Sequence, residues 1–162
     1  MQLVLVLETR ASCESDYRYI KSAIDFFYIE RSFKLTKIFA NNKTELIKQE
    51  KKISECKNKY NGETVVVICA DYDRESDTFN NQLSNYCADN CFELVWMNLD
   101  VEEVFLGKQI PNRLKNKESI NFLKRKDFLL SSIQTLNAPN PTTFHPASNL
   151  LIIIDKYLKR KT

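Results

Sequence analysis

Two continuous apolar runs constrain the fold of this chain more than any other feature of its sequence. Residues 3–7 read LVLVL and residues 65–70 read VVVICA, without the polar alternation of a strand that has one face in water. Such runs are typical of strands that helices cover on both faces, as in parallel sheets. Residues 33–39 alternate like a strand with one wetter face, and residues 92–97 form a fourth predicted strand.

Helical patterns separate these strands along the chain. Apolar side chains recur at helical spacing between residues 17 and 28, and further helices are predicted at residues 44–61 and 78–90. Strands that alternate with helices predict an α/β fold with a mostly parallel central sheet flanked by helices. The chain has 162 residues and shows no internal repeat or linker, so we expect a single domain, residues 1–162.

The pattern changes after the fourth strand. Residues 1–99 are expected to form the α/β core, and residues 100–162 a helical C-terminal extension made of shorter pieces. A proline-rich segment, residues 137–146, must be irregular. Helices in the extension are predicted at residues 100–107, 117–136 and 147–160.

The counts of a few residue types exclude several kinds of site. The chain has 2 glycines, Gly62 and Gly107, which lie too far apart for a glycine-rich phosphate loop or a dinucleotide motif. The single histidine, His145, is expected to make a structural hydrogen bond, and one histidine cannot build a histidine-rich zinc site. Five cysteines, an odd number, predict reduced thiols in a cytoplasmic protein. No apolar stretch reaches the ~20 residues of a membrane helix.

Acidic side chains follow both apolar runs. Asp71 and Asp73 come directly after the second run, and in an extended backbone they point to the same side. Glu8 ends the first strand and lies within reach of both if the two strands are neighbours, because ligands bind at the carboxyl ends of parallel strands. Close carboxylates repel unless a cation neutralises them, and hard oxygen ligands favour a divalent metal such as magnesium or manganese. The alternative is that these acids cap helices or lie in solvated loops.

The order of these elements resembles the Toprim (topoisomerase/primase) domain over residues 1–97. The resemblance rests on an apolar strand that ends in Glu8 and another that ends in the motif of Asp71 and Asp73. The opening LVLVLETRASCESDYRYIKSAIDFF and the later phrase CFELVWMNLDVEEVFLG are similar to segments of the small Toprim proteins related to OLD nucleases and RloB. Such proteins are often found among bacterial phage-defence genes.

The resemblance implies a role for each of these acids. Glu8 would be the general acid or base, and Asp71 and Asp73 would bind Mg²⁺ or Mn²⁺ together with Glu8. Thr9 stands where the family commonly has glycine, and the loop that follows is longer, so Glu14 is the alternative to Glu8 in a different register. The accessory acids of the site are expected to be Glu14, Asp16 and Asp77.

The function implied is that of a metal-dependent nuclease, or a related phosphotransfer enzyme, in bacterial phage defence. A divalent ion held by carboxylates offsets charge on a phosphodiester while a nearby glutamate moves the proton, which requires neither histidine nor cysteine. DNA, RNA and nucleotides stay open as substrates. The rival is a catalytically inactive Toprim-like module that binds a protein partner or a second copy of the chain. A receiver domain is the least favoured interpretation. Receiver domains carry an acid pair after the first strand, whereas in this chain the pair, Asp71 and Asp73, follows the third predicted strand.

Basic side chains are concentrated in the last third of the chain. Lys124, Arg125 and Lys126 are predicted to contact the phosphates of a nucleic acid. The alternative is a solvated helix face, and the net charge of +3 does not favour strong electrostatic binding. No membrane partner is expected.

Overall fold

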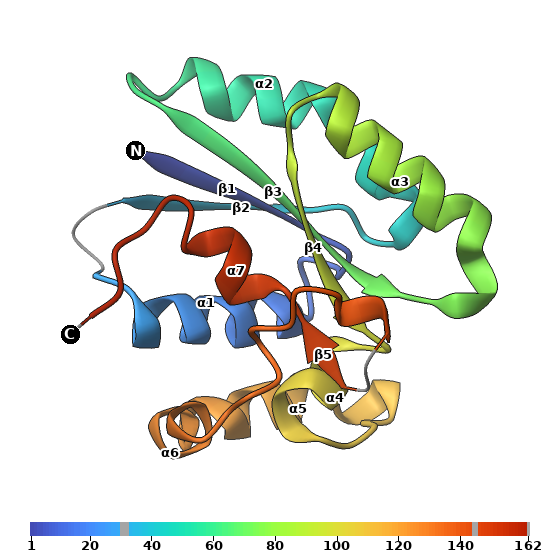
Figure 1. Cartoon of the computed structure of the whole chain (residues 1–162), viewed down its shortest axis with the longest axis vertical. Coiled ribbons are helices and arrows are strands. Elements are labelled where there is room, and N and C mark those ends of the chain that lie inside the picture. Colours follow the sequence, from blue (N-terminus) through green and yellow to red (C-terminus); the bar gives the residue numbers. More distant parts are fainter. Residues whose placement is uncertain (30–32, 144–145, 162) are drawn as a thin grey trace.

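The computed structural model describes residues 1–29, 33–143 and 146–161, so His145 lies outside the described residues. One five-stranded sheet has the order β2-β1-β3-β4-β5 (Figure 1). β1 to β4 are parallel, and β5 runs antiparallel to β4, which confirms the predicted α/β class with a mostly parallel sheet. The strands are β1 (Gln2–Leu7), β2 (Lys34–Phe39), β3 (Thr64–Tyr72), β4 (Glu93–Asn98) and β5 (Ala147–Ser148).

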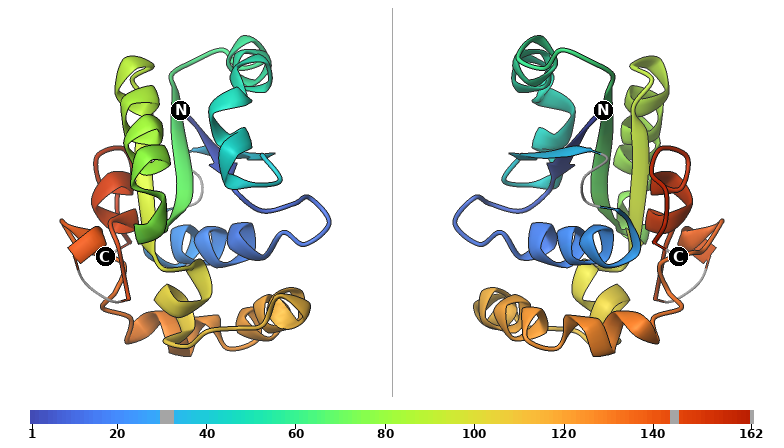
Figure 2. Two further views of the ribbon diagram at one scale, coloured as in Figure 1. Left: turned by 90° about the vertical axis from the view of Figure 1, so that its right-hand side faces the viewer. Right: turned by 90° about the vertical axis from the view of Figure 1, so that its left-hand side faces the viewer.

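Helices cover both faces of this sheet. The α-helices are α1 (Ser15–Phe27), α2 (Glu50–Asn58), α3 (Asp77–Asp89), α4 (Val101–Leu106), α5 (Asn112–Leu123), α6 (Lys126–Ser131) and α7 (Leu150–Ile154). Short 3₁₀ helices are η2 (Lys43–Lys48), η3 (Arg74–Ser76) and η4 (Pro141–Thr143). α2 and α3 pack on one face, and α1 packs with the C-terminal helices on the other. In the turned views, α5 and α6 lie at the bottom of the molecule and α2 at the top (Figure 2).

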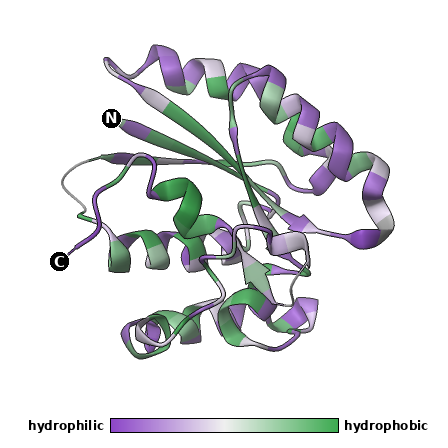
Figure 3. Ribbon diagram, viewed as in Figure 1, coloured by the Kyte–Doolittle hydropathy of each residue, from purple (hydrophilic) through white to green (hydrophobic). Residues whose placement is uncertain are grey.

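The apolar strand runs build a core on each face, because successive side chains of a strand point to opposite sides. Leu3, Leu5 and Leu7 pack against α1 and the C-terminal helices, whereas Val4 and Val6 face α2 and α3. All five side chains are fully buried, which explains why the run has no polar position. Each such burial stabilises the fold by about 1.5–3 kcal/mol. The hydrophobic colour follows the central strands and α7, while purple residues interrupt α2 and α3 (Figure 3).

The C-terminal extension also supplies a strand, which corrects the prediction of one helix over residues 147–160. β5 pairs with the end of β4, and α7 is five residues long. Asn149 explains the change: its Oδ1 accepts a hydrogen bond from Trp96 N at 2.9 Å, and its Nδ2 donates to Leu94 O at 3.1 Å. The side-chain amide thus continues the hydrogen bonding of β4 beyond the residues that pair with β5. A helix over residues 147–160 would not place the Asn149 amide beside β4.

Two other predicted helices are divided in the structure. Residues 44–61 form η2 and then α2, and residues 117–136 fall on α5 and α6. Arg125 separates α5 from α6, because its φ of −124° and ψ of 7° leave the helical region. The short helix predicted at residues 100–107 is confirmed as α4. Across the described ranges, no helix is long and apolar enough to cross a membrane.

Candidate active site

The carboxyl ends of β1 and β3 meet at the centre of the sheet. The two strands are neighbours and run parallel, as expected, and the chain passes from β1 to β2 on one side while β3 lies on the other. Such a switch point is where open α/β sheets bind ligands. Glu8 follows β1 directly, Asp71 is the penultimate residue of β3, and Asp71 N donates a hydrogen bond to Glu8 Oε2 at 3.3 Å. The sheet therefore fixes both acids at one edge.

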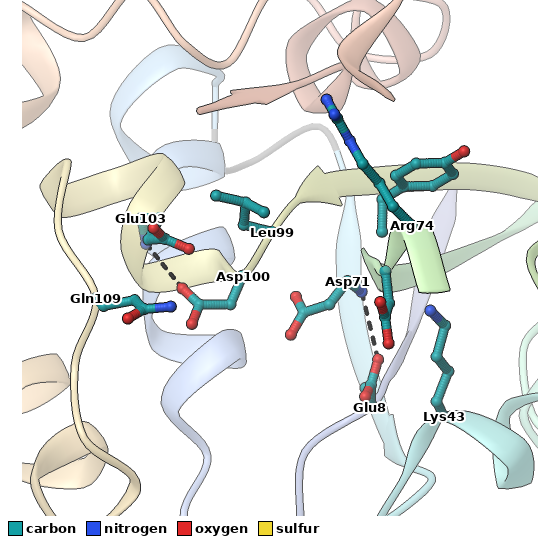
Figure 4. A pocket seen from close by; sticks show the side chains of 10 residues that line it. Glu8, Lys43, Asp71, Arg74, Leu99, Asp100, Glu103 and Gln109 are labelled. Carbon is teal, nitrogen blue, oxygen red and sulfur yellow. Dashed lines mark hydrogen bonds between the residues drawn. The ribbon is translucent and has the colours of Figure 1, made fainter. Parts of the chain in front are cut away.

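A cavity of about 480 Å³ opens above these two acids. The Asp71 side chain points across it toward Asp100, which follows β4, while Glu8 lies below the end of β3 and Lys43 lies on the opposite wall from Asp100 (Figure 4). Among the described residues, none donates a hydrogen bond to the Asp71 carboxylate. The full lining is Glu8, Lys43, Asp71, Tyr72, Asp73, Arg74, Leu99, Asp100, Glu103 and Gln109.

A second cavity of about 590 Å³ shares Glu8 and Asp71 with the first and extends toward the start of α1. Its other polar residues include Asp16, at the first turn of α1, and Lys115 from α5. Asp71 thus stands between a cavity that faces Lys43 and a cavity that faces Asp16. Asp16, expected as an accessory acid, is brought to the site.

Burial makes the charged forms of the two central acids costly. The pKa of Asp71 is raised well above its ordinary value by desolvation, and next by the charges of Asp16 and Glu8. Desolvation also raises the pKa of Glu8, although the hydrogen bond from Asp71 N and the charge of Lys43 oppose this rise. Both carboxylates would be stabilised in their charged forms by a cation in the cavity.

Asp16, in the first turn of α1, is a buried acid. It is 9% exposed, and its carboxylate accepts a hydrogen bond from Ser15 Oγ at 3.2 Å. Desolvation, followed by the charges of Glu102 and Glu8, raises the pKa of Asp16 from 3.8 to about 7. Asp16 therefore takes up or releases a proton close to neutral pH.

Behind Asp16, a buried ion pair joins α4 to α5. Glu102 is fully buried, and Lys115 Nζ donates to its Oε2 at 2.9 Å while lying 3.5 Å from Asp100 Oδ2. Burial alone would lower the pKa of Lys115, but the hydrogen bond to Glu102 and the charges of Asp100 and Asp71 raise it. Lys115 is thus a permanent cation among the acids Glu102, Asp100 and Asp71.

Asp73 lies at the site in a different way from Asp71. β3 ends at Tyr72, so the extended backbone that would aim both carboxylates at one point stops before Asp73. Asp73 is exposed, and its Oδ2 accepts a hydrogen bond from Ser76 Oγ at 3.1 Å. It lines the first cavity and its charge acts on Glu8. Asp73 therefore approaches Glu8 from the turn that precedes α3.

Other residues predicted for the site lie away from the two cavities. Glu14 precedes α1 and pairs with Lys37 at 2.7 Å, and Asp77 is the exposed first residue of α3. Neither lines the cavities that contain Glu8 and Asp71. The same holds for the basic residues at the junction of α5 and α6, which are Lys124, Arg125 and Lys126.

The structure adds residues that the sequence reasoning missed. Asp100 follows the fourth strand, so the rule that selected Glu8 and Asp71 could have found it. Lys43, Glu102 and Lys115 carry no such signal, because their positions depend on how η2, α4 and α5 pack. In the part of the chain that the structure describes, no three or more Asp, Glu, His or Cys side chains are grouped closely enough to hold a metal ion.

The chemistry of this edge follows from its donors. Five acidic residues line the first cavity, Glu8, Asp71, Asp73, Asp100 and Glu103, and carboxylate oxygens are the ligands that Mg²⁺ and Mn²⁺ prefer. Lys43 and Arg74 add positive charge to the same walls, which suits an anionic substrate. No protein-family model, curated protein or solved structure matches the chain.

Proposed function

We propose that this protein is a Mg²⁺- or Mn²⁺-dependent enzyme of the Toprim type that cleaves phosphodiester bonds in nucleic acid. One observation carries the proposal: neighbouring parallel strands deliver Glu8 and Asp71 to a shared cavity at the switch point. The Asp71 carboxylate faces that cavity without a hydrogen-bond donor among the described residues. An unneutralised carboxylate of raised pKa is a suitable cation ligand.

The chemical type of the donors agrees with the metal that the Toprim resemblance implies, and the side chains would have to close around the ion, because no three described acids are grouped closely enough to hold it as they stand. Glu8 and Asp71 would hold the ion, and Asp73 and Asp100, which line the same cavity, would complete the oxygen ligands or orient bound water. When bound, the ion supplies positive charge that offsets the negative charge of the reacting phosphodiester. The raised pKa values of Glu8 and Asp71 support this assignment, because a cation lowers the cost of keeping both acids ionised.

Glu8 is the side chain best placed to move a proton. Its carboxylate is fixed by the end of β1 and by the hydrogen bond from Asp71 N, and burial raises its pKa above the ordinary glutamate value. A proton carrier must be held within hydrogen-bond reach of the reacting group, and a fixed carboxylate meets this need better than one on a mobile loop. Glu8 would thus serve as general acid or base.

The proposed setting is bacterial phage defence in the cytoplasm, with DNA or RNA as the partner. This part rests on the Toprim resemblance of residues 1–97. Lys124, Arg125 and Lys126 are proposed to contact the nucleic acid outside the cavity. Arg125 lines a separate hollow of about 320 Å³ between α4 and α5.

A second candidate function is a catalytically inactive module that binds a protein. The observation in its favour is three large apolar side chains of α5 and α6 that are exposed: Phe128 is 71% exposed, and Ile120 and Leu123 are each about 40% exposed. A contact with another protein would remove them from water. In this case the acids at the sheet edge would have no role in turnover.

The variant Asp71→Asn tests the proposed function. We expect the wild-type protein to bind Mn²⁺ by calorimetry and to cleave single- or double-stranded DNA or RNA, and Asp71→Asn to lose cleavage by about 100-fold or more. Without metal the variant should be no less stable than the wild type, because it removes an acid whose charged form is costly. The matched control is Asp77→Asn, which alters an exposed acid outside both cavities. If the wild type binds no Mn²⁺ and cleaves no nucleic acid, the second candidate function replaces the first.

A further inference from the structure

Lys43 occupies an unusual position on the wall of the first cavity. It is the first residue of η2, which follows β2, and the side chain of Asn42 caps this turn by accepting a hydrogen bond from Glu45 N at 3.1 Å. The turn is therefore fixed beside the carboxyl ends of β1 and β3. Figure 4 shows the side chain of Lys43 rising beside Glu8 along the wall opposite Asp100.

The ammonium group of Lys43 is shielded from solvent and has no hydrogen-bond partner among the described residues. An ammonium carries three N–H donors, and burying them unpaired costs free energy. Its neighbours are the aromatic rings of Phe79 and Trp96, whose centroids lie 6.0 and 5.9 Å from Nζ. Ring faces attract a cation but leave its N–H donors largely unused. Lys43 thus has unused donors beside a cavity that also holds Glu8 and Asp71, and a shift of its side chain away from the rings would bring them into that cavity.

We infer that Lys43 binds a non-bridging oxygen of the substrate's phosphate group in this cavity. The inference rests on the proposed function and adds the residue that recognises the phosphate of its substrate. A phosphate oxygen accepts charge-assisted hydrogen bonds from an ammonium and at the same time faces the carboxylate side of the cavity, where the divalent ion would lie. Arg74 lines the same cavity as a second cation. Without such cations, the five acids that line the cavity would repel a phosphate.

Two other roles are compatible with the contacts of Lys43: packing against the rings of Phe79 and Trp96, and acting as a counter-charge for Glu8. Packing alone predicts no phosphate affinity that depends on Lys43. The charge of Lys43 does lower the pKa of Glu8, but no hydrogen bond joins the two side chains. A counter-charge would change proton affinity and metal binding at Glu8. A phosphate ligand would instead change the affinity for phosphate, so the two roles can be measured separately.

Trp96 provides a built-in reporter for this binding. It is the single tryptophan of the chain, and its ring also packs edge-on against Tyr72 at 5.3 Å, with Tyr72 lining the cavity. A phosphate that draws the ammonium of Lys43 away from the ring changes the electrostatic surroundings of the indole. Trp96 fluorescence should therefore follow phosphate binding directly, without any turnover.

The experiment is a titration of the full-length protein with inorganic phosphate, with and without Mg²⁺, followed by Trp96 fluorescence. We expect a saturable change in the wild type, and a loss of phosphate affinity of about 10-fold or more in Lys43→Met. Lys48→Met is the matched control, because Lys48 lies in the same η2 turn and pairs with Glu45 on the surface. Lys43→Arg keeps the charge and the donors, so it should retain most of the affinity and separates loss of binding from misfolding. A dinucleotide and a nucleoside monophosphate as further titrants distinguish a phosphodiester from a phosphomonoester site.

The Mn²⁺ affinity of each variant, measured by calorimetry, separates this inference from the proposed function. Lys43→Met should bind Mn²⁺ at least as tightly as the wild type, because a positive charge beside Glu8 has been removed. Phosphate binding that depends on Lys43 in a protein that binds no Mn²⁺ would support the inference and contradict the proposed function. The inference is overturned if the wild type binds no phosphate under either condition, or if Lys43→Met binds it as the wild type does.

Discussion

Two regions at the carboxyl edge of the sheet each hold a carboxylate of raised pKa, and they differ in how its charge is compensated. In the region formed by α4 and α5, Glu102 is fully buried and has an internal cation, since Lys115 Nζ lies 2.9 Å from its Oε2. In the region formed by β1 and β3, the Asp71 carboxylate has a raised pKa and no hydrogen-bond donor among the described residues. The Glu102 pair has its counter-charge inside the fold, although Glu102 Oε1 is buried without a hydrogen-bond partner, and loss of either partner would leave a buried charge uncompensated. The Asp71 carboxylate leaves room for a ligand that stabilises the fold only when it binds.

The largest effect should come from removing the internal cation. Lys115→Met leaves Glu102 buried without a counter-charge, so we expect the free energy of unfolding to fall by about 3 kcal/mol. Urea denaturation at neutral pH measures this loss. Adding Glu102→Gln to Lys115→Met should restore much of the stability, because the unpaired charge is then gone. The surface variant Lys48→Met should cost less than about 0.5 kcal/mol, and an equal loss in both variants would mean that Glu102 does not depend on Lys115 for its counter-charge.

An intermediate effect is expected at Asp16, which lies between the two regions. Its pKa of about 7 in the folded protein exceeds the ordinary 3.8, so the folded state binds the proton more tightly than the unfolded state. The stability that this proton contributes is fully present below about pH 4 and is lost as the pH rises through 7. Asp16→Asn should therefore flatten the dependence of stability on pH between about 4 and 7, where one such group contributes at most about 1.4 kcal/mol per pH unit.

Denaturation curves at several pH values measure this slope. Asp127→Asn is the matched control, because Asp127 is likewise an acid in the first turn of a helix but is exposed. An unchanged slope in Asp16→Asn would show that Asp16 is ionised throughout this range and that this side chain is better solvated than its burial indicates.

The smallest effect should be that of Glu14→Gln. Glu14 pairs with Lys37, but the two side chains are 32% and 36% exposed, so the loss in stability should be below about 0.5 kcal/mol. Cleavage should also persist, whereas Glu8→Gln should reduce turnover strongly with little change in substrate binding. Initial cleavage rates of Glu8→Gln and Glu14→Gln decide which of the two acids carries the proton. The reverse ranking would place the proton carrier on the loop before α1 instead of at the end of β1.

The central part of this site could be predicted from sequence because strand geometry dictates it. Apolar runs without polar breaks indicated buried parallel strands, and such strands deliver Glu8 and Asp71 to one edge. Asp73 was harder to place, because the sequence does not show that β3 ends at Tyr72. Lys43 could not be predicted at all, since its position depends on a 3₁₀ turn and on rings from α3 and β4.

The C-terminal region was predicted less well for a related reason. A two-residue strand such as β5 has no periodicity to detect, and its pairing with β4 joins residues about 50 positions apart. The decisive contacts of Asn149 are made with the backbone of Leu94 and Trp96, which local sequence does not encode. Contacts of this kind arise only once the sheet has formed.

The Asn149 amide has a consequence for how molecules of this protein meet one another. An uncovered strand at the edge of a sheet can pair with the same strand of another molecule and start aggregation. At β4, the β5 pairing and the two Asn149 hydrogen bonds already occupy backbone groups that a second chain would need. At the opposite edge, β2 carries the exposed side chains of Lys34 and Lys37, and lysine at a sheet edge disfavours pairing with a further strand. Hydrogen bonds thus protect one edge of the sheet, and lysine side chains protect the other.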